Sequence, residues 1–449
     1  MTTFCQRLYK DVQSCIDSLA APECIGSIVT SDAAFSRRRK ISFQDVVNTM
    51  LFAGPSPLQD LCNSFYSFNA PPTKSAFIQA RDKILPEAFE RLFRMVNAIY
   101  PCSTTLENGM PLIACDGSGY NTPYDPSNKA TYMANRDGAK GRNQLHLNCL
   151  YDVLSQRYID CIIQGVPDMN ETAAMSAMVD RYEGPKSLFV ADRNYPSLNN
   201  MAHIHENGHH YIIRIKDIDA QGSLLRSLGL PESGEFDETV HATLTRRRNK
   251  ATRGSKGYKI LSDSSPFDFI DSGHPYYEAS YRVIRYENDG GWYCLITNLP
   301  EGEYPKGEVI ATYWRRWDIE KSYFHLKYAA CLNCIHSRKN GALIMEAWAA
   351  MTLYNISSIA VMHEARRLER KGKAEAAKRR KHEYKINFTT ALHSVRESFW
   401  TAASKKAGGV SMGLGGTMSA SLTPIRPGRA NTRKLRKDKR TVSFCVRYC

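Results

Sequence analysis

The feature that most constrains the fold is a series of short apolar runs in the middle of the chain, separated by turn residues and helix-like stretches. Runs of this length, bounded by Gly, Pro, Asn and Asp, are typical of strands. Three runs come in succession, and a helical pattern then precedes each of the last two. This order predicts a mixed α/β layered domain. The runs are Pro111–Cys115, Leu145–Val153, Tyr158–Ile163, Ser187–Ala191 and His210–Ile215.

The segments around these runs differ in pattern. Residues 1–108 show helical spacing of apolar side chains, so they form either a DNA-binding module or a plain helical cap. Residues 217–300 read as a β-rich insertion with frequent turn residues. The core, 109–216, therefore resumes at 301–362, within a long helical region, and a basic C-terminal region follows at 363–449.

The charge of the chain is concentrated at its C-terminal end. The formal net charge is +15, and residues 363–449 hold 22 Lys and Arg against 6 Asp and Glu, a net of +16. The preceding residues therefore sum to about −1. Such asymmetry favours a nucleic-acid surface, although the helical part, Arg366–Lys385, also fits a solvated helix. We expect residues 426–449 to contribute sequence-independent DNA affinity.

The pattern of apolar residues and cysteines argues against a membrane or secreted protein. The N-terminus has no apolar signal core. The longest apolar stretch, Leu343–Met362, contains Glu346 and Asn355, which predicts a buried helix rather than a membrane span. Thirteen irregularly spaced cysteines fit free thiols in a reducing compartment. We therefore expect no membrane partner and a reducing compartment.

Two aspartates follow apolar runs and are candidate site residues. Asp116 comes directly after Pro111–Cys115, and Asp192 comes directly after Ser187–Ala191. The carboxyl ends of strands are where α/β sheets build their sites. An aspartate at such a position is also a common helix cap or turn residue.

Four polar residues in the later helical segment share one face. Tyr313, Arg316, Glu320 and Lys327 lie at i, i+3, i+7 and i+14. At about 100° per residue these positions form one narrow stripe. A solvated, ion-paired helix face is the alternative, but it leaves the two neighbouring tryptophans unexplained. A stripe of cations and a hydroxyl around one carboxylate suits a site that binds phosphate and metal together.

The spacing Tyr-x2-Arg-x3-Glu-x6-Lys, as Tyr313, Arg316, Glu320 and Lys327, resembles the signature of the IS4-family DDE transposases. Asp116-Gly117-Ser118 and Asp192-Arg193-Asn194-Tyr195 look like the first and second aspartate motifs of that family. The intervals of 76 and 128 residues leave room for a β-strand insertion before the glutamate. The resemblance covers about Phe43 to Arg440.

The resemblance implies a ribonuclease-H-like, or retroviral-integrase-like, catalytic core. It further implies that Asp116, Asp192 and Glu320 converge on two Mg²⁺ ions, for which Mn²⁺ would substitute. In-line attack on a phosphodiester needs such a pair, one ion to activate the attacking oxygen and one to stabilise the leaving oxygen. Their carboxylates are expected about 4–8 Å apart.

The resemblance also implies a set of DNA-binding residues. Tyr313, Arg316 and Lys327 would hold backbone phosphates of the element end, which fixes position without reading sequence. Arg214 matches a family arginine that contacts the DNA end. Trp292 matches a tryptophan that stacks on an expelled base, with a core aromatic of the insertion as the alternative.

The function that the resemblance implies is that of an insertion-sequence transposase. It would bind the terminal inverted repeats of its element, cut the ends, and join the 3′ ends to target DNA, as a homodimer in the DNA complex. Such an enzyme would be located in the bacterial cytoplasm, associated with the nucleoid. A nuclease of the same fold and a non-catalytic DNA-binding repressor are the alternatives. Two zinc-like patterns, His203–His210 and Cys331–His336, lack a complete ligand set at zinc spacing and are not assigned to metal.

Overall fold

The structure is a computed structural model that describes residues 3–37, 39–66, 70–135, 138, 140–218, 220–224, 228–250, 252, 257–375, 383–405, 409–411, 413–426 and 445–446. Most of the predicted basic DNA-binding tail, 427–444 and 447–449, lies outside the described residues, as do 376–382 of the preceding basic helix. Across the described ranges, no helix combines the length and apolar character needed to cross a bilayer.

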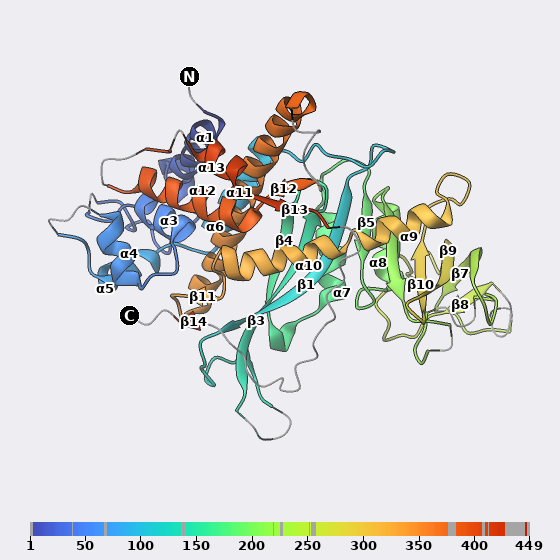
Figure 1. Cartoon of the computed structure of the whole chain (residues 1–449). Coiled ribbons are helices and arrows are strands. Elements are labelled where there is room, and N and C mark those ends of the chain that lie inside the picture. The colour runs from blue at the N-terminus through green and yellow to red at the C-terminus, as the bar shows by residue number, and fades with distance from the viewer. Residues whose placement is uncertain are drawn as a thin grey trace.

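One ten-stranded mixed sheet runs through the protein (Figure 1). Its strands lie in the order β2-β3-β1-β5-β6-β10-β9-β7-β8, with β4 also paired to β3. The prediction of a mixed α/β fold is therefore confirmed. The strands are β1 (Leu112–Thr122), β2 (Tyr132–Met133), β3 (Arg142–Asp152), β4 (Arg157–Gly165), β5 (Leu188–Ala191), β6 (His210–Ile215), β7 (Phe236–Thr245), β8 (Tyr258–Ile260), β9 (Tyr276–Asn288) and β10 (Gly291–Thr297).

The helices begin where the sequence supplies capping side chains. Ser42, for example, accepts a hydrogen bond from the backbone of Asp45, and the Asp45 carboxylate accepts one from the backbone of Ser42. The described helices are α1 (Phe4–Leu19), α2 (Pro22–Ile25), α3 (Phe43–Phe52), α4 (Leu58–Phe65), α5 (Lys74–Arg81), α6 (Glu87–Ile99), α7 (Glu171–Asp180), α8 (Leu198–Glu206), α9 (Lys306–Trp314), α10 (Trp317–Phe324), α11 (Asn340–Glu375), α12 (Phe388–Ala403) and α13 (Leu414–Ala420). Two small strand pairs join β11 (Cys334–Ile335) with β14 (Cys445–Val446) and β12 (Tyr384–Ile386) with β13 (Leu422–Pro424).

The helices from the two ends of the chain pack together on one side of the molecule. Figure 1 shows the blue helices α1–α6 gathered with the orange and red helices α11–α13. Their contacts are aromatic at several points: the Phe52 and Phe399 ring centroids are 5.5 Å apart, and those of Phe93 and Trp348 are 5.1 Å apart. The N-terminal and C-terminal helical segments therefore share one hydrophobic core.

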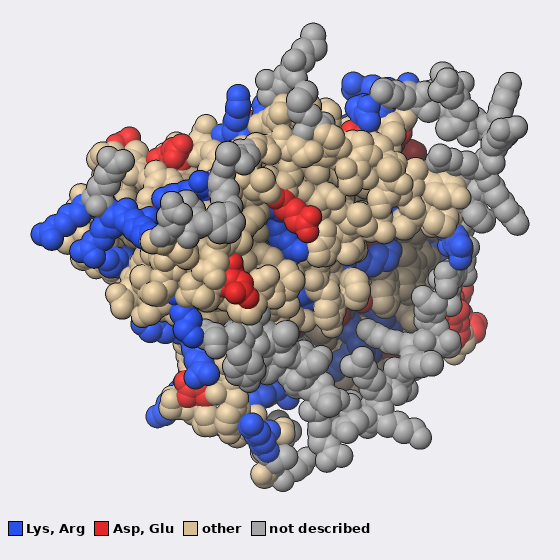
Figure 2. All heavy atoms as spheres, turned by 60° about the vertical axis from the view of Figure 1, so that its left-hand side comes forward, with Lys and Arg blue, Asp and Glu red and all other residues tan. Residues whose placement is uncertain are grey.

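The two faces of the sheet have different cores. Met175 of α7 and Met201 of α8 belong to a core on one face. Ile319 of α10 and Met351 of α11 belong to the other core, which continues into the helical body. Figure 2 shows a cluster of Lys and Arg side chains at the left edge of the view, with others in its middle and lower parts.

Several expected segments have different bounds in the structure. The first apolar run continues as a strand to Thr122, because β3 pairs with β1 along its whole length. The β-rich stretch extends the central sheet, since β10 pairs with β6. The long helical region expected after Lys306 is broken by a π-helical turn at His325–Ala329 and by Cys331, whose φ is 63°. The sequence from Ala407 to Gly416 is Gly-rich, which predicts a linker, but the chain is helical from Leu414.

Candidate active site

The two predicted aspartates lie on, or directly after, neighbouring parallel strands. β1 and β5 pair in register up to Cys115 and Ala191, so Asp116 and Asp192 come next along the two chains. Adjacent strands lie about 4.8 Å apart, which makes these positions neighbours. Asp192 directly follows the end of β5, as expected. Asp116 lies inside β1 rather than at its end, because β1 continues to Thr122.

Both aspartates point toward the sheet face that α10 covers. Successive side chains of a strand alternate between the faces. Cys115 and Ala191 belong to the core under α7 and α8, so the residues that follow them point the other way. Ile319 and Tyr323 of α10 belong to the core on that second face. The aspartates and α10 therefore lie on the same side of the sheet.

Hydrogen bonds hold the segment that carries Glu320 against β1. The Tyr323 hydroxyl donates to the backbone carbonyl of Asp116 at 2.7 Å. The Lys327 ammonium donates to the Ser118 hydroxyl at 2.7 Å. These bonds lie one and two turns after Glu320. They attach its helix to the first aspartate motif, although about 200 residues separate the two in sequence.

Arg316 is a buried cation within this group. Its Nη2 donates to Glu320 Oε1 at 2.9 Å, and the residue is only 4% exposed. Its Nε and Nη1 atoms are buried and have no partner within hydrogen-bond geometry in the described structure. Guanidinium donors are costly to leave unpaired. The two free donors therefore suit an incoming anion such as a backbone phosphate.

The three carboxylates influence one another electrostatically. Burial raises the pKa of Asp116 to about 7, and the negative charges of Asp192 and Glu320 raise it as well, while Arg316 opposes the shift. Nearby like charges have this effect because they disfavour the ionised form of the Asp116 carboxyl group. The three side chains predicted from separate motifs therefore lie in one electrostatic environment.

The remaining signature residues belong to the same environment. Burial lowers the pKa of Lys327, and the nearby Asp116 opposes that shift. Burial raises the pKa of Tyr313, with Arg214 lowering it and Asp192 raising it. Tyr313, Lys327 and Arg214 are thus each within electrostatic reach of an aspartate or of one another.

The signature residues do not lie on one continuous helix, which corrects the expectation of a single stripe. Tyr313 is on α9, Arg316 lies between α9 and α10, Glu320 is on α10, and Lys327 is in the π-helical turn. The 100° spacing therefore does not run through all four positions. Their side chains are gathered by packing against β1, and wider turns of this kind often occur at functional sites.

Arg214 and Trp292 occupy different faces of neighbouring strands. The Arg214 guanidinium lies 3.9 Å from the ring centroid of Tyr293. Trp292 precedes Tyr293 on β10, so its ring points to the other face of that strand. It is 40% exposed, and the Arg285 guanidinium lies 3.9 Å from its ring centroid. Trp292 is thus a surface side chain, which contradicts the alternative of a buried core aromatic.

The sequence did not identify a pair of side chains behind the first aspartate. His146 Nε2 and Glu171 Oε1 lie 3.0 Å apart. Both press against Gly117, where an added Cβ would be 2.4 Å from each of these atoms. Close packing at Gly117 thus explains the glycine of the aspartate motif. Tyr323 was also missed, although its position one turn after Glu320 was a signal.

The structure does not show a formed metal cage. Among the residues that the structure describes, no group of three or more His, Cys, Asp or Glu side chains is arranged to hold a metal ion. The charges of Asp192 and Glu320 act on Asp116, although the three side chains do not form such a group. Glu320 accepts a hydrogen bond from Arg316. The expected carboxylate separation of about 4–8 Å stays a prediction.

Histidines of both zinc-like patterns contact oxygen atoms of other residues. His203 lies between two carboxylates, with Nδ1 2.7 Å from Asp180 and Nε2 2.9 Å from Asp268. His336 Nε2 lies 3.1 Å from the backbone oxygen of Ser56. His203 of α8 thus contacts α7 at Asp180 and a loop at Asp268, and His336 connects two loops.

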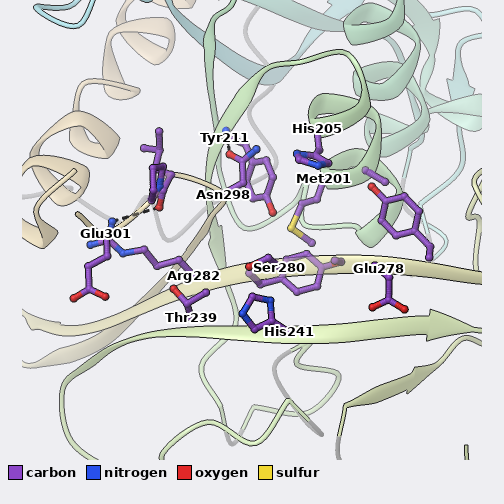
Figure 3. A pocket seen from close by; sticks show the side chains of 16 residues that line it. Met201, His205, Tyr211, Thr239, His241, Glu278, Ser280, Arg282, Asn298 and Glu301 are labelled. Carbon is purple, nitrogen blue, oxygen red and sulfur yellow. Dashed lines mark hydrogen bonds between the residues drawn. The ribbon is translucent and has the colours of Figure 1, made fainter. Parts of the chain in front are cut away.

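A pocket of about 530 Å³ lies away from the aspartates (Figure 3). Met201, Tyr211 and Tyr281 line it, and all three belong to the core under α7 and α8. Figure 3 shows His205, His241 and Glu278 around the same pocket. Because the aspartates point to the opposite face of the sheet, the pocket is separate from the candidate active site.

Comparisons with known proteins match the region that contains this site. A protein family described as "Transposase DDE domain" matches residues 107–356, which include all three carboxylates. The chain is 22% identical over 291 residues to the transposase InsG of the insertion sequence element IS4 from Escherichia coli strain K12. That alignment covers 63% of this chain and 60% of the relative, less than two thirds of its length. The piggyBac transposase synaptic complex with hairpin DNA, a cryo-EM structure, aligns with a TM-score of 0.45 at 10% identity, over 96% of this chain and 89% of that one.

Proposed function

The chain belongs to the transposase DDE domain family and is related to the transposase of the element IS4, and from that premise we propose that it is the transposase of an insertion sequence. It binds the terminal inverted repeats of its element, cleaves the ends, and joins the 3′ ends to target DNA. The observation that carries the proposal is the grouping of Arg316, Glu320 and Lys327 around Asp116 and Asp192. The family match confirms the resemblance on which these residues were chosen.

The proposed core is ribonuclease-H-like, and the sheet topology supports it. Five adjacent strands lie in the order β4-β3-β1-β5-β6. β3 runs antiparallel to its neighbours β1 and β4, whereas β5 and β6 run parallel to β1. The helices at residues 1–108 and the basic region at 363–449 are proposed as additional DNA-binding surfaces on this core.

The donor set fits divalent cations. Asp116, Asp192 and Glu320 offer only carboxylate oxygens, which Mg²⁺ and Mn²⁺ prefer. Arg316 offsets only part of the burial and like-charge effects on Asp116, so a bound cation would stabilise the ionised carboxylates further. In this proposal two Mg²⁺ ions supply activation of the attacking oxygen and stabilisation of the leaving oxygen.

The cationic side chains bind and orient the DNA backbone. Arg316 has two unpaired donors to give to a phosphate, and it holds Glu320 until DNA or a cation competes for either group. Lys327 is held beside the first aspartate motif through Ser118, so it fixes a phosphate next to Asp116. Tyr313 and Arg214 extend this surface along β6 and α9.

Trp292 is proposed as a stacking residue for a base expelled near the cleavage site. Its exposure and its contact with Arg285 support the proposal, because an exposed ring backed by a cation stacks well on a nucleobase.

The transposase acts as a homodimer when it holds two element ends.

Two alternatives predict different products. A stand-alone nuclease would hydrolyse the DNA but would not join a precleaved end to a plasmid. A DNA-binding repressor would bind without cleaving. The carboxylates argue against the repressor, because three buried or half-buried acids in one field cost stability without serving DNA binding.

Cleavage of a labelled terminal-repeat duplex in Mg²⁺ tests the proposal. Glu320→Gln keeps the size of the side chain and removes its charge, so it should abolish cleavage while binding of the end persists. Asp318→Asn is the matched control, because Asp318 lies on the same helix and pairs with Lys321 instead. Normal cleavage by Glu320→Gln would exclude its role in the reaction.

A further inference from the structure

An exposed row of aromatic side chains lies along the helix that carries Glu320. Trp317 is 39% exposed, and Phe324 and Tyr328 are each 58% exposed. The last two are the most exposed large hydrophobic side chains among the described residues. Burying apolar surface is favourable, so a group of this kind marks a surface that binds something. We call these three residues the aromatic face.

Two rings of the aromatic face contact each other, and the third lies further along the same helix, with Glu320 between them in sequence. The Phe324 and Tyr328 ring centroids are 4.9 Å apart, and these residues lie on either side of the junction between α10 and the π-helical turn. Trp317 stacks on Trp314 with 6.4 Å between centroids and 17° between ring planes. Glu320 lies between Trp317 and Phe324 in the same helix, within one turn of each.

The surroundings of the aromatic face favour a nucleic acid. The exposed Lys321 lies on α10 between Trp317 and Phe324 and pairs with Asp318. Lys327 is next to Tyr328 in sequence and donates to Ser118 of the candidate site. Aromatic rings interleaved with cations are the common means of binding unpaired DNA, since every base has a face on which a ring can stack.

A second protein is a poorer fit to the same surface. Three rings that are already about half covered expose roughly 400 Å² at most. A stable protein interface needs about 800 Å² from each partner. The aromatic face is therefore too small to be the apolar centre of an obligate dimer, but large enough for two or three bases.

We propose that the aromatic face is a stacking platform for unpaired bases of the DNA strand next to the cleavage site. This inference rests on the proposed function and adds to it a binding site for single-stranded DNA, distinct from Trp292 on β10. The platform would hold the strand after the ends separate and keep the bond to be cut beside Glu320.

The test compares two double variants of the full chain. Phe324→Leu with Tyr328→Leu keeps apolar bulk and removes both aromatic rings. Phe324→Tyr with Tyr328→Phe is the matched control, because it keeps both rings. Each protein is titrated with a terminal-repeat duplex that has a single-stranded flank containing 2-aminopurine, and with the blunt duplex of the same sequence.

The wild type and the ring-keeping control should quench 2-aminopurine and bind the flanked duplex more tightly than the blunt one. The leucine variant should lose the quenching and weaken binding of the flanked duplex by about tenfold or more, since one stacked base contributes about that factor. Its affinity for the blunt duplex should change by less than about twofold. Both side chains are mostly exposed, so melting temperatures should agree among the three proteins.

Three results would overturn the inference. One is a leucine variant with wild-type affinity and quenching on the flanked duplex. Another is an equal loss of affinity for both duplexes. The third is a leucine variant that binds both duplexes like the wild type but differs from it in oligomeric mass by light scattering. That result would assign the aromatic face to contact with a second copy of the chain. Failure of the wild type to bind or cleave any terminal-repeat duplex would instead reject the proposed function, so the two failures are distinguishable.

Discussion

Replacing Gly117 by alanine tests how the first aspartate is held in place. Gly117 follows Asp116, and its φ lies outside the left-handed region, so the backbone tolerates alanine. The obstacle is steric: an added Cβ would lie 2.4 Å from His146 Nε2 and 2.4 Å from Glu171 Oε1. Real Cβ contacts are never that short, so one neighbour must move.

The two neighbours differ in their freedom to move. The Glu171 side chain is 21% exposed and flexible, so it can rotate away more easily than a buried ring. The His146 ring is 9% exposed and is attached to β3, which pairs with β1. Overpacking at such a site typically costs about 1–3 kcal/mol. For a region of the size of this core, each kcal/mol lowers Tm by about 2–4 °C.

Thermal unfolding and end cleavage should be measured on Gly117→Ala, His146→Ala and the double variant. We expect Gly117→Ala to lower Tm by several degrees and to slow cleavage, because the displaced backbone carries Asp116. In the double variant the methyl group fills the space left by the ring, so its Tm should exceed that of Gly117→Ala. Additive losses, or a Gly117→Ala protein with wild-type Tm and cleavage, would refute this account of the contact.

Two further predictions concern charge. Lys327→Ala should weaken binding of the element end and reduce the slope of log K against log salt by about 0.9, the value for one phosphate contact. Lys306→Ala is the control, because the Lys306 ammonium pairs with Glu235; it should leave the affinity and the slope unchanged. Burial lowers the pKa of His203, but hydrogen bonds to Asp268 and Asp180 outweigh it and raise the pKa above its usual value. The stabilisation from this pair should therefore be complete below about pH 6.5 and lost as pH rises through the folded pKa. Unfolding of wild type and Asp268→Asn from pH 5.5 to 9 checks this, and a Tm difference that grows with pH would contradict it.

Local patterns predicted the elements that hold the site better than they predicted its geometry. The apolar run before Asp192 ends where β5 ends, because that strand is short and buried on both faces. The run before Asp116 gave no sign that β1 continues to Thr122, since the extension depends on pairing with β3. Pairing partners are tertiary information, which composition and periodicity do not contain.

The grouping of Arg316, Glu320 and Lys327 was predicted, but for a reason that the structure corrects. A helical wheel assumes one regular helix, and the chain breaks its helix twice in this segment. The residues still converge because Tyr323 and Lys327 bond to β1. The contact of His146 and Glu171 with Gly117 had no sequence signal, because it depends on three separate elements meeting at one glycine.

The most direct test of the proposed transposase is strand transfer with a precleaved element end. The protein, a labelled duplex that ends at the terminal repeat, a supercoiled plasmid and Mg²⁺ should yield plasmid joined to the labelled 3′ end. Asp116→Asn, Asp192→Asn and Glu320→Gln should each abolish the joined product while retaining binding of the end. Hydrolysis of the DNA without joining, or joining that survives these substitutions, would contradict the account.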